Sequence, residues 1–237
     1  MNRPTVLLLH AFPLDARMWE GQRAALEAAG HPVVAPDLPG PAPELGFDVW
    51  ARRVLALVDG AFVPVGCSMG GYLAFELWRQ APERIAALAL VDTRATPDTP
   101  EQREARDDAI RLLGEAGRAA FWDDLAPRLF AAGADPAVVA RAREIALEQP
   151  LTGLVAAQET IRDRVDSRPT LATIDVPVLV AVGEEDGMTP PADAEAMAAA
   201  IDGARLVRIP RAGHLSPLER ADEVAEALLA FLAEVRA

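Results

Sequence analysis

Ser68 is the residue of this chain whose neighbours point most directly to chemistry. It is the central residue of Gly66-Cys67-Ser68-Met69-Gly70, which matches the pattern G-x-S-x-G. In this pattern the serine occupies a sharp turn from a strand into a helix, and a side chain two residues away on either side would collide with the turn. A serine held in this way is a candidate nucleophile. The glycines bracket Ser68 and not Cys67, so we interpret Cys67 as a small residue packed at the strand end.

A serine hydroxyl becomes an effective nucleophile when a base, usually a histidine, takes its proton. The chain has three histidines. His31 lies in a helix-to-strand connection, at the edge of the predicted sheet opposite the carboxyl ends of the strands, where such sites form. His10 ends the first predicted strand, but its neighbours indicate another role. His214 follows the last predicted strand, so elimination favours it as the base.

The acid that orients the histidine should follow a strand at the same edge and precede the histidine in the chain. Asp186 meets both conditions, because it comes directly after a fully apolar predicted strand. Its carboxylate would fix the tautomer of the histidine and stabilise the imidazolium as it forms. Glu184 and Glu185 are close enough in sequence to be alternatives, and Asp92, at the end of the fourth predicted strand, is a rival. Asp186 remains the preferred choice.

The segments that must position these residues alternate between short apolar runs and helical patterns. The apolar runs lack polar alternation, as expected of strands covered on both faces. Such a rhythm predicts an α/β fold with a parallel sheet of about six strands and helices on both faces. The predicted strands are 5–10, 32–37, 62–67, 85–92, 176–183 and 204–209. The predicted helices of this layer are 17–29, 47–58, 69–80, 192–201 and a last one with the apolar stripe Val224, Leu228, Phe231 and Val235.

The strand pattern stops between residues 96 and 168, where only helical patterns occur. The predicted helices there are 100–113, 118–125, 136–149 and 151–165, the last with Val165 on its apolar stripe. The strand pattern resumes afterwards and no Gly/Ser-rich or charged linker separates the parts. We therefore expect a core formed by residues 1–95 and 169–237, with residues 96–168 inserted as an all-helical cap.

Composition excludes several classes of protein. A chain of 237 residues with 51% hydrophobic residues forms one domain with one core. It has no lysine, which excludes a Walker A phosphate loop and a pyridoxal Schiff base. A net charge of −13 disfavours nucleic acids and membrane surfaces as partners. The single cysteine and the scattered histidines give no disulfide and no zinc spacing. No targeting segment or 18-residue apolar run is present, so we expect a cytoplasmic protein.

The order Ser68, Asp186, His214 resembles that of the α/β-hydrolases, and the resemblance extends over essentially the whole chain. It includes the segments His10 to Asp15, Asp37 to Gly40, Gly183 to Asp186 and Gly213-His214. The nearest branches are small carboxylesterases and enol-lactonases with a helical cap. The resemblance implies an oxyanion hole formed by the backbone N–H groups of Phe12 and Met69. Two departures are that Ala11 stands where the family usually has glycine, and that the predicted sheet lacks the family's usual N-terminal pair of strands.

We therefore expect a serine hydrolase that cleaves small carboxylic esters through an acyl-enzyme, without a metal or other cofactor. An enol-lactonase and a cofactor-free haloperoxidase or perhydrolase are alternatives from the same resemblance, and a non-catalytic binding protein is a more distant one. Acidic substrates would require an arginine, for which Arg94 and Arg128 are candidates by position. The sequence leaves a homodimer open. The candidate substrate contacts are Phe121, Trp122, Leu125 and Phe130.

Overall fold

The computed structural model describes residues 3–39 and 44–235, so Gly40 of the Asp37 segment lies outside the described residues. A six-stranded sheet with the strand order β2-β1-β3-β4-β5-β6 forms the centre of the fold, and every neighbouring pair of these strands is parallel. The predicted parallel sheet of about six strands is confirmed. The strands are β1 (Thr5–Leu9), β2 (Val33–Val34), β3 (Phe62–Cys67), β4 (Leu88–Val91), β5 (Val178–Gly183) and β6 (Arg205–Ile209).

The inner strands of the sheet are fully buried, whereas the edge strand β2 is short. Every residue of the inner strands β3, β4 and β5 is buried, as the unbroken apolar runs of the sequence predict. The edge strand β2 has only two residues, where the sequence predicts six. Pro32 and Pro36 flank it, and neither can donate a backbone hydrogen bond to a neighbouring strand.

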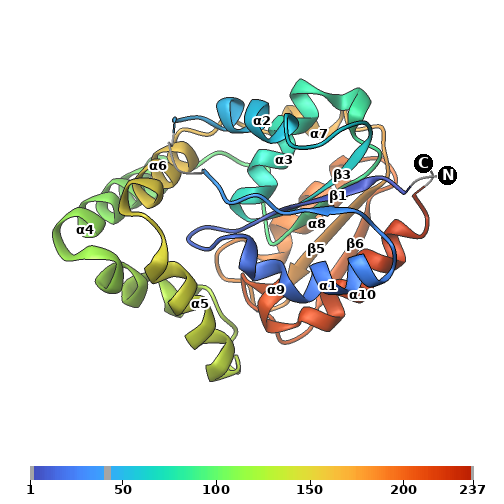
Figure 1. The fold of residues 1–237 in the computed structure, drawn as a ribbon. Coiled ribbons are helices and arrows are strands. Elements are labelled where there is room, and N and C mark those ends of the chain that lie inside the picture. The colour runs from blue at the N-terminus through green and yellow to red at the C-terminus, as the bar shows by residue number, and fades with distance from the viewer. Residues whose placement is uncertain (1–2, 40–43, 236–237) are drawn as a thin grey trace.

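Helices cover both faces of the sheet (Figure 1). Helices α1 (Glu20–Ala28) and α10 (Ala221–Leu232) pack together on one face, and α2 (Phe47–Leu55) and α3 (Met69–Gln80) pack together on the other. Helix α8 (Pro191–Ala200) packs on β5 and β6. The amphipathic pattern of α2 illustrates why these segments are helices, since its buried residues Phe47, Trp50, Ala51 and Val54 recur at helical spacing.

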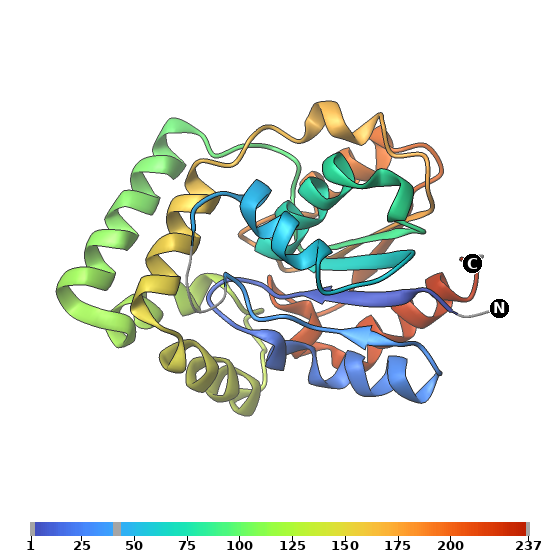
Figure 2. The same ribbon diagram turned by 45° about the horizontal axis from the view of Figure 1, so that its top comes forward.

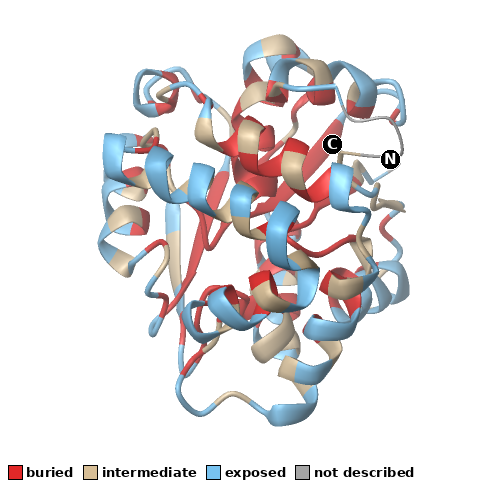
Figure 3. Cartoon of the chain, turned by 90° about the vertical axis from the view of Figure 1, so that its left-hand side faces the viewer, coloured by how far each residue is buried: buried red, intermediate tan, exposed pale blue. Residues whose placement is uncertain are grey.

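Three longer helices lie between β4 and β5 in the chain and gather at the end of the sheet opposite the two termini (Figures 1 and 2). They are α4 (Pro100–Leu125), α5 (Pro136–Glu148) and α6 (Leu151–Arg162). Their outward faces are exposed, whereas the strands behind them are buried (Figure 3). Short helices η1 (Ala16–Trp19), η2 (Pro82–Arg84), η3 (Ala126–Arg128), α7 (Arg168–Leu171) and α9 (Ser216–Glu219) complete the described elements.

Two details of this helical block differ from the sequence prediction. The predicted helices 100–113 and 118–125 form one element, α4, with a kink at Gly117, where φ is 78°. Helix α6 ends three residues earlier than predicted, so Val165 is 60% exposed and does not belong to a buried stripe. Beyond the helix, the Arg164 guanidinium donates to the carbonyl of Ile161 and pairs with Asp98. No helix in the described part of the chain is long and apolar enough to cross a membrane.

Candidate active site

Ser68 lies at the turn between β3 and α3, with backbone angles φ 50° and ψ −110°. Two close approaches explain the flanking glycines. A Cβ on Gly66 would lie 2.3 Å from the carbonyl oxygen of Gly70, and a Cβ on Gly70 would lie 2.1 Å from that of Leu9. The backbone N–H of Ser68 donates to Val91 of the neighbouring strand at 2.9 Å. The sequence therefore holds a non-glycine residue in the left-handed region by removing side chains on either side of it.

Replacing Gly70 by alanine is expected to destabilise the fold by about 3 kcal/mol or more, because the new methyl group meets a backbone carbonyl of β1 that cannot move aside. Gly114→Ala is the matched control. A Cβ at this exposed position of α4 meets nothing within 4 Å, and it should raise stability by roughly 0.5–1 kcal/mol. Urea denaturation measures both, and equal effects of the two substitutions would contradict the steric account of the turn.

The side chains of Ser68, His214 and Asp186 form a hydrogen-bonded chain. His214 Nε2 lies 2.8 Å from Ser68 Oγ, and His214 Nδ1 lies 2.9 Å from Asp186 Oδ2. The neutral tautomer that satisfies both contacts carries its hydrogen on Nδ1, donates it to the carboxylate and accepts the serine hydroxyl proton at Nε2. The structure thus brings together the three residues that the sequence singles out from three different loops. All three side chains are buried.

Asp186 is held as an ionised acceptor by the turn that follows β5. The backbone N–H groups of Met188 and Thr189 donate to Oδ1 at 2.8 and 2.9 Å, and the Thr189 hydroxyl donates to Oδ2 at 2.7 Å. Burial alone would raise the pKa of Asp186. The hydrogen bond and charge of His214 and the donors of Thr189 outweigh burial and lower that pKa. The carboxylate therefore remains negative next to the histidine.

Asp92, the rival acid, lies at the same sheet edge but performs a different task. Its Oδ1 accepts from Gly183 N–H and its Oδ2 from Ser216 N–H, each at 2.9 Å. Burial is the largest cause that raises the pKa of Asp92, and the negative charge of Asp186 is the second. Together they raise this pKa to about 7. Asp92 thus ties the end of β5 to the start of α9, which directly follows the loop that carries His214. Glu184 and Glu185 are exposed.

The loop after β1 is fixed by a buried neutral histidine. His10 Nε2 accepts from the backbone N–H of Leu38 at 2.8 Å, and Nδ1 lies 3.1 Å from the carbonyl oxygen of Ala11. Burial lowers the pKa of His10. The Cβ of Ala11, at the position where glycine was expected, is accommodated in the core, and the Ala11 N–H donates to the Met18 sulfur at 3.0 Å.

Two backbone N–H groups near Ser68 have no acceptor in the part of the chain that the structure describes. Among the described residues, nothing accepts from the N–H of Phe12 or from the N–H of Met69. Met69 begins α3, so its N–H is one of the donors that a helix leaves without an internal partner. Both N–H groups are thus available to a ligand.

Two cavities have Phe12 in their walls. The first, of about 30 Å³, holds roughly one water and contains the Ser68 and His214 side chains in its wall. The second, of about 240 Å³, lies under α6 and is bordered by Phe12 and Met69. The wall of the first is completed by Tyr72, Arg94, Arg106, Leu125, Leu129, Ile161, Met188 and Thr189. The wall of the second is mainly apolar and includes Pro13, Leu14, Leu38, Pro39, Gly153, Leu154 and Ala157.

The comparisons with known proteins agree with this geometry. Residues 6–227 match the model of the alpha/beta hydrolase family. The chain belongs to this family. The solved structure of a thermophilic esterase from Thermogutta terrifontis, with malate bound, is 35% identical, covers 100% of this chain and 92% of that chain, and superimposes with a TM-score of 0.93.

Two further relatives of this hydrolase carry the names of ester-cleaving enzymes. The enol-lactonase from Burkholderia xenovorans LB400 is 30% identical over 99% of this chain and 93% of that chain, with a TM-score of 0.87. A pimeloyl-[acyl-carrier protein] methyl ester esterase from Aromatoleum aromaticum is 28% identical over 95% of this chain and 96% of that protein.

The four predicted substrate contacts of the hydrolase differ in their position relative to the cavity at Ser68. Leu125 lines the cavity at Ser68. Phe121 packs edge-on against Phe12, with ring centroids 5.8 Å apart. Trp122 and Phe130 pack against each other at 6.2 Å and are not among the residues that line this cavity.

Several residues at the site were not singled out in the sequence. Thr189 follows Asp186 by three residues, and a hydroxyl at that spacing after an acid could have drawn attention to it. Tyr72 lies one helical turn after Ser68 on α3, a spacing that could also have indicated a place near the hydroxyl. Arg106 carries no such signal, because α4 brings it to the cavity only through the packing of the whole helix.

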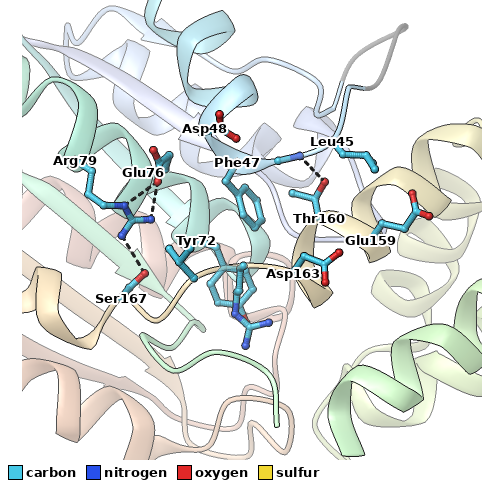
Figure 4. A pocket seen from close by; sticks show the side chains of 13 residues that line it. Leu45, Phe47, Asp48, Tyr72, Glu76, Arg79, Glu159, Thr160, Asp163 and Ser167 are labelled. Carbon is cyan, nitrogen blue, oxygen red and sulfur yellow. Dashed lines mark hydrogen bonds and ion pairs between the residues drawn. The ribbon is translucent and has the colours of Figure 1, made fainter. Parts of the chain in front are cut away.

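A larger cavity of about 550 Å³ lies on the other side of Tyr72, between α2, α3 and α6 (Figure 4). Its walls are tied by hydrogen bonds from Gly46 N–H to Thr160 and from the Arg79 guanidinium to Ser167. Tyr72 borders both this cavity and the one at Ser68. Ser68 is not among the residues lining the larger cavity, so the chemistry of the site belongs to the smaller one.

Proposed function

We propose that the protein is a carboxylic ester hydrolase in which Ser68, His214 and Asp186 act as nucleophile, base and acid. The observation that carries this proposal is the chain of two hydrogen bonds at 2.8 and 2.9 Å that joins the three side chains. Its esterase and lactonase relatives support the same reaction class.

The reaction would proceed by acyl transfer to water. His214 Nε2 takes the Ser68 proton as Oγ attacks the ester carbonyl carbon, and the oxyanion accepts hydrogen bonds from the N–H groups of Phe12 and Met69. The imidazolium then gives its proton to the alcohol oxygen as the carbon–oxygen bond breaks. Water, activated by the same histidine, attacks the acyl-enzyme and releases the acid and free Ser68. Each oxyanion donor of this kind typically contributes about 3 kcal/mol of transition-state stabilisation.

We further propose that residues 96–168 act as a cap over the site. The segment after α4 is bonded to the loop that carries the base, because His214 N–H donates to the Leu129 carbonyl at 2.9 Å. The Glu219 carboxylate accepts from Ala131 N–H at 2.9 Å and from Gly213 N–H at 2.8 Å. A movement of this segment would therefore shift the base as well as the cavity wall.

The small size of the cavity at Ser68 predicts a preference for short substrates. With p-nitrophenyl acetate, butyrate and octanoate, kcat/KM should be highest for the two short esters, because the 30 Å³ cavity at Ser68 leaves little space for an eight-carbon chain. Release of p-nitrophenol measures this.

Bromination or perhydrolysis assayed with added hydrogen peroxide tests the haloperoxidase alternative. Peroxide-dependent activity that exceeds ester hydrolysis would contradict the proposed function.

A further inference from the structure

A cluster of three arginines surrounds one buried carboxylate beside the cavity at Ser68. Arg94 and Arg106 each approach Asp98 at 3.0 Å, and Arg164 approaches it at 2.7 Å. The Asp98 side chain is fully buried, and those of the arginines are 12%, 18% and 4% exposed. Burial alone would raise the pKa of Asp98, but the charges of Arg106 and Arg164 outweigh it and lower the pKa. Three positive charges around one negative charge leave an excess of two.

The three arginines differ in how fully their donors are used. Arg164 donates to the carbonyls of Thr96 and Ile161 and stacks on the Tyr72 ring at 4.3 Å, so it is a structural part of the cluster. Arg106 also donates to Gln158. Arg94 is different, because its Nε is buried and has no hydrogen-bond partner among the described residues. A buried guanidinium donor without a partner is unfavourable by itself and becomes favourable when an anion accepts from it.

The position of this cluster connects it to the reaction. Arg94 and Arg106, but not Arg164, line the same cavity as Ser68 and His214. The chain as a whole has a net charge of −13, so an excess positive charge at this site runs against the overall balance of the protein. Guanidinium groups recognise carboxylates through parallel N–H donors. A substrate carboxylate would supply the acceptor that Arg94 lacks.

We propose that the preferred substrate is an ester that carries a free carboxylate close to the ester bond, and that Arg94, assisted by Arg106, binds this carboxylate. This inference rests on the proposed function and specifies its substrate class. Arg128, the other arginine considered from the sequence, does not serve this purpose, because it is exposed and pairs with Asp124.

Two pairs of matched substrates test the proposal. Monomethyl glutarate is compared with methyl glutaramate, which replaces the carboxylate on the acyl side by a neutral amide. The acetate ester of 4-hydroxybutanoate is compared with that of 4-hydroxybutanamide, which makes the same change on the alcohol side. In at least one pair the carboxylate should raise kcat/KM by about 10- to 100-fold, the effect of a charge-assisted hydrogen bond. Acid release in a pH-stat measures all four rates.

Variants assign the preference to its residue. Arg94→Gln should reduce the ratio of kcat/KM within the preferred pair to about one, and Arg94→Lys, which keeps the charge, should retain part of it. Arg128→Gln removes the same charge from an exposed position and should leave the ratio unchanged. Inhibition of the unmodified enzyme by glutarate, compared with glutaramide, gives a readout that does not depend on the folding of a variant, and glutarate should inhibit at least about tenfold more strongly.

Failure of this inference is distinguishable from failure of the proposed function. Equal rates within both pairs, together with equal inhibition by glutarate and glutaramide, would overturn the carboxylate site while ester hydrolysis dependent on Ser68 persisted. A preference that survives Arg94→Gln would also overturn it. If the unmodified enzyme hydrolysed none of the esters, that result would instead contradict the proposed function.

Discussion

Ser68→Ala is expected to lower the rate of ester hydrolysis by about 10⁴- to 10⁶-fold, because it removes the proposed nucleophilic oxygen while leaving the backbone donors in place. The fold should be retained, since the substitution keeps Cβ and the backbone hydrogen bond of Ser68 to Val91. Hydrolysis of p-nitrophenyl acetate and a far-ultraviolet circular dichroism spectrum measure the two quantities.

The other serines of the chain provide the control for this experiment. Ser167 lies beside the larger cavity, where its hydroxyl accepts a hydrogen bond from Arg79 at 3.2 Å. Ser167→Ala should therefore leave the hydrolysis rate within about twofold of the rate of the unmodified enzyme. Removing this one hydrogen bond lowers the free energy of unfolding by only about 0.5–1.5 kcal/mol and does not change the reacting groups. A Ser68→Ala protein that hydrolyses the ester as fast as Ser167→Ala would exclude Ser68 as the nucleophile.

Asp186→Asn is expected to lower kcat by about 10⁴-fold with a much smaller change in KM. An amide keeps one oxygen to accept the N–H groups of Met188 and Thr189, but its NH₂ group can face His214 Nδ1. That arrangement favours the tautomer with hydrogen on Nε2, which cannot accept the Ser68 proton. Steady-state kinetics separate kcat from KM.

Glu185→Gln is the matched control for Asp186→Asn. It removes the same negative charge one residue away, from an exposed side chain whose contact is with the backbone of Ala132 at 3.2 Å. Its kcat should remain close to that of the unmodified enzyme. If Glu185→Gln and Asp186→Asn reduced kcat to the same extent, the loss would come from the charge of the loop and not from the contact with His214.

Local signals in the sequence are sufficient to predict the centre of the fold and to single out Ser68 as the candidate nucleophile. Strand β3 and helix α3 begin and end at the predicted residues, because the apolar run, the glycines and the helical pattern all agree there. His214 could be selected because only three histidines had to be compared.

The geometry separates Asp186 from Asp92, which the sequence leaves as a rival to the preferred Asp186. Both residues follow an apolar strand at the same edge, so position in the chain does not separate them. The structure shows that the backbone of Asp92 turns to φ 44° and that its carboxylate accepts from Gly183 and Ser216. Asp186 instead lies in a turn whose donors leave Oδ2 facing His214.

The arginine cluster could not be predicted from any pattern in the sequence. Arg94 follows β4, Arg106 is on α4, and Arg164 follows α6, with no shared spacing. Asp98 brings them together only because the helices between β4 and β5 pack over the sheet edge. The same packing determines that Leu125 reaches the cavity while Trp122 turns toward Phe130.

Covalent labelling with a fluorophosphonate tests the central claim most directly, because the reagent phosphonylates a serine only when a base activates its hydroxyl. Intact-mass spectrometry of the unmodified enzyme should show one added phosphonyl group, and peptide mapping should place it on Ser68. The Ser68→Ala protein should remain unlabelled under the same conditions. An enzyme that hydrolyses esters but carries the label on another residue, or carries none, would contradict the assignment of Ser68 as the activated nucleophile.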